Sequence, residues 1–162
     1  MYDFLIMNTL GYPILSLLIF LPLAGVIPLL ILKNDEAAKY WTLVITLVIA
    51  VISLPLYFKF DKMTHLYQFG EHHAWIPMWD INYTLGIDGI SLLLILLTTL
   101  LMPLCVLCSW RYITTRVRPF FACLLIMETS MLGVFMSLDF VLFYILWEAM
   151  LIPMYLLIAI WG

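Results

Sequence analysis

Two glutamates interrupt long stretches of apolar sequence. Glu128 is the tenth of the 20 residues in 119–138, and Glu148 is the ninth of the 23 residues in 140–162. A carboxylate at the centre of a membrane helix costs roughly 2.5–3.5 kcal/mol, and protonating an ordinary glutamate at pH 7 costs about 3.7 kcal/mol. Because these costs are comparable, each residue is a candidate proton relay that exchanges between carboxylate and neutral acid. The alternative for each is a protonated acid that only holds two helices together.

The residues around Glu148 favour a polar path. Pro153 cannot donate a hydrogen bond to the carbonyl group of Ala149, so that oxygen is free to bind water or a neighbouring helix. Tyr144 and Tyr155 lie on the same helical face as Glu148, four residues before it and seven after it. Glu148, the two tyrosines and the freed carbonyl group together indicate a polar path, along which Glu148 would relay protons. In the alternative interpretation, Pro153 only distorts the helix.

The composition requires a membrane environment. Of the 162 residues, 66% are hydrophobic and 10% are charged, whereas a soluble domain carries about 25% charged residues. The chain therefore has too few polar side chains to cover a soluble fold, and a lipid bilayer is the solvent that suits it. The formal net charge of −3 argues against a nucleic-acid partner.

Long uncharged stretches predict an all-α, polytopic transmembrane helix bundle. About 20 apolar residues in a helix span the hydrocarbon core of roughly 30 Å. The predicted spans form one membrane domain and cover residues 10–32, 40–58, 89–110, 119–138 and 140–162. Residues 59–88 are expected to form an external loop whose aromatic rings lie at the level of the lipid headgroups. None of the spans contains Lys or Arg, so a cationic partner for Glu148 would lie outside them.

Basic residues are distributed unevenly between the predicted loops. The link between the first and second spans and the link between the third and fourth contain five of the seven basic residues, namely Lys33, Lys39, Arg111, Arg116 and Arg118. Loops rich in Lys and Arg stay on the cytoplasmic side of a membrane. We therefore predict that the N-terminus lies outside.

Two other groups of side chains have types that can do chemistry. Cys105 and Cys108 form a C-x-x-C pattern, which is typical of redox sites in thioredoxin-like proteins. Inside an apolar helix, however, two thiols behave as small hydrophobic side chains. His65, His72 and His73 have a spacing that matches no usual metal-ligand pattern. We predict no metal site and no cofactor site in this chain.

Three segments resemble one protein family. They read LGIDGISLLL from Leu85, GVFMSLD from Gly133, and LDFVLFYILWEAMLIPMYLLIAIWG from Leu138. The W-E-x-x-L-x-P core around Glu148 resembles the antiporter-like superfamily. The Pro-Met-Tyr at Pro153 favours the chain M family (subunit 4 in mitochondria) of proton-translocating NADH–quinone oxidoreductase, or respiratory complex I. The resemblance covers essentially the whole chain.

The resemblance implies an antiporter-like subunit of about fourteen helices with inverted repeats, of which this chain would hold the first five. It also implies that Glu148 is the glutamate essential for pumping and that its partner is a lysine in the seventh helix. Because that helix is missing, we expect the chain to be a fragment. Asp88 is expected to cap the third helix. The resemblance assigns no role to Glu128.

The implied function is proton translocation coupled to electron transfer from NADH to a quinone, in a bacterial cell inner membrane or the mitochondrial inner membrane. The implied partners are the other membrane-arm subunits and the lipid bilayer. Partner subunits would bind NADH, FMN, the iron–sulfur clusters and the quinone. Two alternatives remain open. One is a subunit of a multisubunit Na+/H+ antiporter, and the other is a non-translocating structural subunit in which Glu148 only packs.

Overall fold

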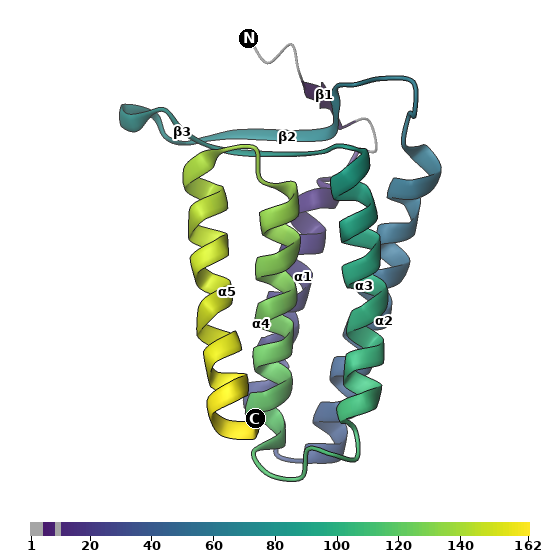
Figure 1. Ribbon diagram of the computed structural model, residues 1–162, viewed down its shortest axis with the longest axis vertical. Helices are drawn as coiled ribbons and strands as arrows, with labels where there is room; N and C mark the ends of the chain where they lie inside the picture. Colours follow the sequence, from purple (N-terminus) through teal and green to yellow (C-terminus); the bar gives the residue numbers. More distant parts are fainter. Residues whose placement is uncertain (1–4, 9–10) are drawn as a thin grey trace.

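The computed structural model describes residues 5–8 and 11–162 (Figure 1). Within these residues the chain forms five long helices and a three-stranded sheet. The helices lie side by side, and the sheet lies across one end of the bundle. The helices are α1 (Ile14–Ile31), α2 (Asp35–Lys59), α3 (Gly89–Ser109), α4 (Val117–Met136) and α5 (Phe140–Trp161).

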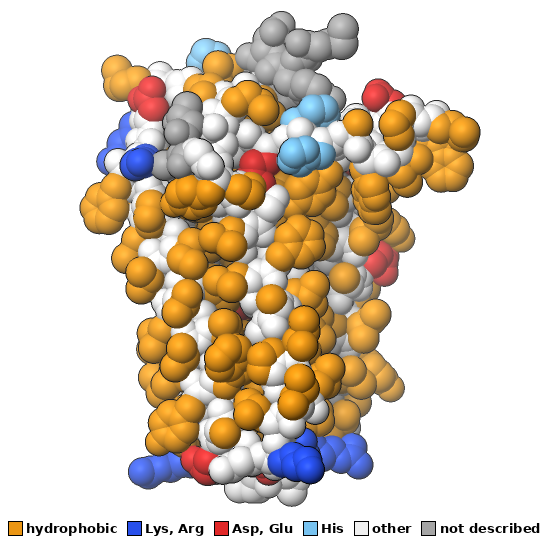
Figure 2. Space-filling view, turned by 180° about the vertical axis from the view of Figure 1, so that it is seen from behind, with side chains coloured by type: hydrophobic (Ala, Val, Ile, Leu, Met, Phe, Trp, Pro, Cys, Tyr) orange, Lys and Arg blue, Asp and Glu red, His pale blue; other side chains and the backbone are white. Residues whose placement is uncertain are grey.

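Each of the helices α1 to α5 is long and apolar enough to cross a membrane. Large hydrophobic side chains, such as those of Leu30, Leu97 and Ile152, remain exposed along them. Figure 2 shows hydrophobic side chains covering the waist of the molecule between its two charged ends. This is the kind of belt that the hydrocarbon core of a bilayer covers. The prediction of a polytopic helix bundle is therefore confirmed.

The two ends of the bundle differ in charge. The α1–α2 link and the α3–α4 link lie at the end away from the sheet (Figure 1). We call this the basic end because five of the seven Lys and Arg residues lie in or beside these links. The opposite end, which we call the sheet end, carries Lys59 and Lys62.

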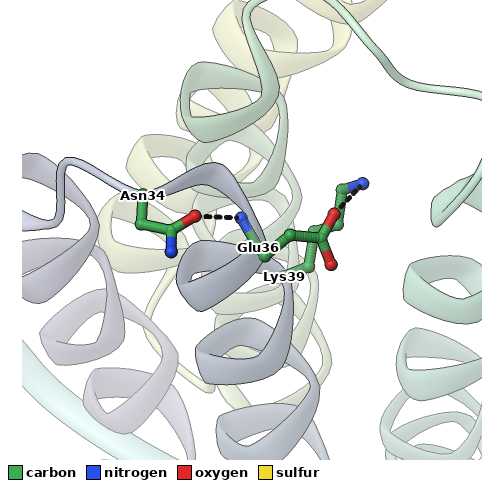
Figure 3. Close-up of polar contacts among 3 residues, drawn as sticks. All are labelled: Asn34, Glu36 and Lys39. Atoms are coloured by element: carbon green, nitrogen blue, oxygen red, sulfur yellow. Dashed lines mark hydrogen bonds and ion pairs between the residues drawn. The ribbon is translucent and has the colours of Figure 1, made fainter.

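Helix α2 begins five residues earlier than predicted, at Asp35 instead of residue 40. Asn34 is its N-cap, and the Asn34 side chain accepts a hydrogen bond of 3.0 Å from the backbone N–H of Glu36. Lys39 forms an ion pair of 3.0 Å with Glu36 one turn away (Figure 3). The charged first turn belongs to the helix because a cap and a local ion pair stabilise it.

The segment 59–88 is not a simple loop, contrary to the prediction, so the mostly helical fold also contains a small sheet. Strands β2 (Tyr67–Ile76) and β3 (Ile81–Ile87) are joined by a 3-10 turn at Pro77–Trp79 and pair antiparallel. Strand β1 (Leu5–Met7) pairs parallel with β2. The sheet satisfies backbone hydrogen bonds that an irregular loop at the membrane surface would leave to water.

Glu71 of β2 attaches the hairpin to the start of α1. Its carboxylate accepts hydrogen bonds from the backbone N–H groups of Leu15 (2.8 Å) and Ser16 (3.1 Å) and from the Ser16 hydroxyl. Tyr83 Oη lies 2.9 Å from Ser16 Oγ, which extends the network to β3. The N-terminus of a helix favours a carboxylate because its first N–H groups are unpaired and its dipole is positive there. Glu71 therefore caps α1 from a distant part of the sequence.

Helix α4 lies at the centre of the bundle, and α5 lies at its edge. In the most apolar part of α4, 67% of the residues are buried, compared with 11% in α5. α4 contacts each of α1, α2, α3 and α5, and its side chains Phe121, Leu125 and Leu132 are fully buried. A polar side chain on α4 is therefore enclosed by protein, whereas most of the α5 surface is open.

Candidate functional site

The start of α5 is anchored to the sheet through Asp139. Its carboxylate caps the helix by accepting hydrogen bonds from the backbone N–H groups of Val141 (2.9 Å) and Leu142 (3.2 Å). It also accepts a hydrogen bond of 3.0 Å from the backbone N–H of Asn82 in β3. At a rise of about 1.5 Å per residue, these contacts fix Glu148 roughly 14 Å below the sheet end of α5.

The position of α5 against α4 depends on Gly133. A Cβ atom at this position would lie 2.6 Å from Cδ1 of Leu146. The glycine therefore lets α5 approach α4 more closely than any other residue would. Because Leu146 precedes Glu148 by two residues, this close approach fixes the rotation of α5 and with it the direction of the Glu148 side chain.

Glu148 lies partly exposed on α5. The Tyr144 side chain, one turn before it, interacts with the Glu148 carboxylate. Tyr155 is 70% exposed and lies two turns beyond Glu148, about 10 Å along the axis. α5 continues unbroken through Pro153, which is buried. In the part of the chain that the structure describes, Glu148 forms no ion pair.

Glu128 is fully buried on α4, with 0% of its surface exposed. Within residues 5–8 and 11–162, neither of its carboxylate oxygens has a hydrogen-bond partner, and the same holds for Oγ1 of Thr129. An ionised carboxylate in such surroundings carries a large desolvation cost that no partner offsets. The neutral carboxylic acid is therefore the form that this interior favours.

The structure does not turn Glu128 toward α5, the helix that carries Glu148. At about 100° per residue, Glu128 lies about 140° around α4 from Gly133, which faces α5. Leu125, about 60° around from Glu128, contacts α1, since one of its methyl groups lies 3.3 Å from the Cβ position of Gly25. Glu128 therefore faces the interior formed by α1 to α4, away from the helix that carries Glu148.

Buried hydroxyl groups in this interior are a feature that the sequence analysis missed. Ser53 of α2 and Thr99 of α3 form a hydrogen bond of 2.9 Å. Thr42 and Thr46 of α2 are fully buried, and the Thr46 hydroxyl donates to backbone carbonyl groups of its own helix. The sequence pattern could have predicted this cluster, because the hydroxyl residues at 42, 46 and 53 lie on one face of a helix. These hydroxyls and Glu128 add polarity to a largely apolar interior.

At the sheet end, the network of Glu71, Ser16 and Tyr83 perturbs the tyrosine. Burial raises the pKa of the Tyr83 hydroxyl, the hydrogen bond with Ser16 lowers it, and the negative charge of Glu71 raises it. The ring of His73 lies 6.4 Å from the Tyr83 ring. Because the hydrogen bonds of this network join α1, β2 and β3, they serve to position the sheet.

Cysteines and histidines are spread over the structure. Cys105 and Cys108 are exposed on α3 with free thiols. Nδ1 of His72 lies 2.8 Å from Oγ1 of Thr84 on the neighbouring strand. Among the described residues, no three His, Cys, Asp or Glu side chains gather where they could hold a metal ion.

Comparison with known proteins finds similarity to subunits of oxidoreductases. Residues 16–136 match the family described as NADH-ubiquinone oxidoreductase chain 4, amino terminus. The chain is 43% identical over 155 residues to NADH-quinone oxidoreductase subunit M of Rhodobacter capsulatus, covering 92% of this chain and 30% of that protein. It is 40% identical over 150 residues to NADH-ubiquinone oxidoreductase chain 4 of Arabidopsis thaliana, covering 91% and 30%.

A third relative comes from an archaeon. The chain is 36% identical over 150 residues to F(420)H(2) dehydrogenase subunit M of Methanosarcina mazei, covering 93% of this chain and 30% of that protein. The chain therefore spans about three tenths of the length of the curated relatives that it matches.

Proposed function

Because this chain belongs to the NADH-ubiquinone oxidoreductase chain 4 family, we propose that it takes part in proton translocation coupled to electron transfer from NADH to a quinone. The observation that carries the proposal is Glu148, a carboxyl group in the interior of the apolar helix α5 with Tyr144 beside it. The names of the bacterial and plant relatives, both of them subunits of NADH–quinone oxidoreductases, support the same conclusion.

In this proposal Glu148 binds and releases the proton. Its carboxylate accepts a proton and becomes neutral, and it loses that proton when a positive charge approaches, because a nearby cation favours the ionised form. The cation is a lysine on a helix outside the five described here. The partial exposure of Glu148 supports this arrangement, since another helix has access to it. Tyr144, Tyr155 and the carbonyl group freed by Pro153 would line the proton path.

Glu128 is a second relay in the proposal. Its burial without a hydrogen-bond partner in the described chain supports a neutral acid at rest. A proton leaving Glu128 would pass through the interior between α1 and α4, because Glu148 lies beyond α4. Water bridging to the Ser53–Thr99 pair is one route, since buried water bonds to polar groups that lack partners.

The proposal places the redox chemistry in partner subunits. NADH, FMN, the iron–sulfur clusters and the quinone would be bound there, and this chain would contact the other membrane-arm subunits and the lipid of a bacterial cell inner membrane or the mitochondrial inner membrane. The archaeal relative is a subunit of an F(420)H(2) dehydrogenase. A difference in electron donor between such related proteins supports the view that the donor is chosen outside this chain.

The test is Glu148→Gln in the complete protein complex, reconstituted into vesicles. Glutamine keeps the shape of the side chain but cannot carry a proton, so we expect NADH-driven proton uptake to fall at least tenfold. Glu36→Gln is the matched control, because the Glu36 side chain is 59% exposed at the basic end. It removes the same charge and should leave proton uptake unchanged.

The outcome separates the proposal from its two alternatives. Proton uptake at the normal ratio to electron transfer in Glu148→Gln would show that Glu148 only packs, as in a structural subunit. Proton uptake by the unaltered complex that follows an imposed Na+ gradient, with no response to NADH, would favour the Na+/H+ antiporter.

A further inference from the structure

A groove runs between α1 and α4 on the outer surface of the bundle, next to the basic end. Its cavity volume is about 590 Å³. The apolar wall is formed by Val26, Leu29, Leu30, Ala122, Cys123 and Ile126. Along α4 the groove extends from Arg118 to Ile126, about 12 Å at the rise of an α-helix. Its apolar part therefore lies at the depth of the acyl chains. The inner end of the groove, at Ile126, lies well inside the membrane.

Arg118 stands at the end of the groove that meets the membrane surface. Its Nη1 donates a hydrogen bond of 2.9 Å to the carbonyl oxygen of Leu32, and its Nε lies 3.4 Å from Oδ1 of Asp35. These two contacts hold the guanidinium group at the mouth of the groove. The side chain remains 43% exposed, and a guanidinium carries five N–H donors. Donors on Nη1 and Nη2 therefore remain for a ligand.

The chemistry of the groove matches one class of occupant. An apolar wall within the membrane suits an acyl chain, and a fixed guanidinium at headgroup level suits a phosphate group, which it can bind through paired N–H donors. The groove also opens at the end that carries most of the basic residues, where an anionic headgroup is attracted and a zwitterionic one is not. We propose that this groove binds one anionic phospholipid, with its phosphate on Arg118 and one acyl chain between α1 and α4. The inference does not depend on proton translocation.

The experiment uses the complete complex, purified in detergent and incubated with phosphatidylglycerol that carries a photoactivatable diazirine on one acyl chain. Mass spectrometry of the peptides locates the cross-links. We expect cross-links in residues 26–30 and 119–126. Unlabelled phosphatidylglycerol should compete at least fivefold better than unlabelled phosphatidylcholine.

Two substitutions that each remove one positive charge distinguish binding at a specific site from attraction by the general surface charge. Arg118→Gln should reduce the cross-linking about fivefold, the factor expected for one basic residue near an anionic headgroup. Arg116→Gln removes a charge from the same end at a residue that does not line the groove, and should reduce the cross-linking far less than Arg118→Gln. Ala122→Phe fills the apolar part and keeps Arg118, and it should abolish the cross-links in residues 119–126.

Three results would overturn the inference. Equal competition by the two lipids would show that the groove takes membrane lipid without selecting charge. Equal loss in Arg116→Gln and Arg118→Gln would show that only the summed charge of the basic end matters. Absence of cross-links in the unaltered complex would show that protein, such as another helix, covers the groove.

Discussion

Among single residues, Glu128 has the clearest expected effect on stability. Its buried carboxyl group lacks a hydrogen-bond partner in residues 5–8 and 11–162. An unsatisfied buried polar group costs about 1–3 kcal/mol, and methionine fills a similar space without that cost. We therefore expect Glu128→Met to raise the thermal unfolding midpoint of the purified complex. If Glu128 relays protons as proposed, NADH-driven proton uptake falls in the same variant.

Thr129→Val provides the matched control for Glu128→Met. The Thr129 hydroxyl also lacks a partner among the described residues, and valine has nearly the same shape, so stability should rise while proton uptake stays unchanged. A lower unfolding midpoint in Glu128→Met would mean that the carboxyl group is paired in the membrane, for example with water. The burial argument would then be wrong.

Tyr83 provides a prediction about pH. The charge of Glu71 raises the pKa of the Tyr83 hydroxyl, in addition to the larger effect of burial. Glu71→Gln should therefore lower the pKa of Tyr83. Ultraviolet difference spectroscopy of tyrosinate measures this pKa, with Tyr83→Phe as the blank. Because the folded pKa lies above the ordinary value of about 10, the contribution of neutral Tyr83 to stability is complete below about pH 10. It is lost as the pH rises through the raised pKa.

The direction of this change is what tests the network. An unchanged or higher Tyr83 pKa in Glu71→Gln would show that the Glu71 charge does not reach the tyrosine. Loss of stability at alkaline pH should also be weaker in Tyr83→Phe than in the unaltered chain. If Tyr83→Phe and the unaltered chain lose the same stability at alkaline pH, the loss comes from other tyrosines or from lysines.

Between elements, the contact of α4 with α5 at Gly133 controls where Glu148 points. Alanine at this position brings a Cβ to 2.6 Å from Leu146 Cδ1, and such overpacking costs about 1–3 kcal/mol. We expect Gly133→Ala to shift α5 and to reduce proton uptake, with thermal unfolding and vesicle assays as the measurements. Adding Leu146→Ala should restore part of the loss, because it removes the side chain that the new methyl group meets.

The double variant decides whether the contact is the cause. Residues in contact give non-additive effects of about 0.5–3 kcal/mol, whereas independent sites add. Strict additivity of Gly133→Ala and Leu146→Ala would therefore show that the two positions do not touch in the assembled protein.

Hydropathy predicted the helices but not their ends or the sheet. The apolar runs were long enough to identify each span, because the cost of unpaired backbone in lipid leaves little choice of structure. The first turn of α2 was missed because the Asn34 cap and the Glu36–Lys39 pair lie in charged sequence that hydropathy excludes. The hairpin was also missed, although Ile81, Tyr83, Leu85 and Ile87 alternate with smaller or polar residues as in a strand.

The candidate site was predicted only as a set of residue types. Motif and spacing singled out Glu148 and placed Tyr144 beside it, because residues four apart share a helical face. The sequence could not show that Glu128 is enclosed by other helices, since burial depends on which helix is central. Long-range contacts such as that of Glu71 with α1 were equally invisible, because no local pattern links residues 55 positions apart.

Over the whole molecule, the Lys and Arg side chains lie only at the two ends of an apolar bundle (Figure 2). Hydrogen-bonding residues occupy these ends for structural reasons, as the caps formed by Asn34, Asp88 and Asp139 show. The predicted cap at Asp88 is thereby confirmed. Helix capping does not explain the excess of Lys and Arg at the basic end. Such an asymmetry is typical of chains that insert into a membrane with one orientation.

We expect the basic end to face the cytoplasm, or its equivalent, and the sheet end to face outside. Met63 is 93% exposed at the sheet end, and Tyr112 is 83% exposed at the basic end. In a chain whose native cysteines are replaced by alanine, a membrane-impermeant maleimide added to sealed right-side-out vesicles should label Met63→Cys and spare Tyr112→Cys. Inside-out vesicles should give the reverse. Labelling of both positions from one side would contradict a bundle that crosses the membrane between its ends, whereas the reversed pattern would retain the bundle and reject the orientation.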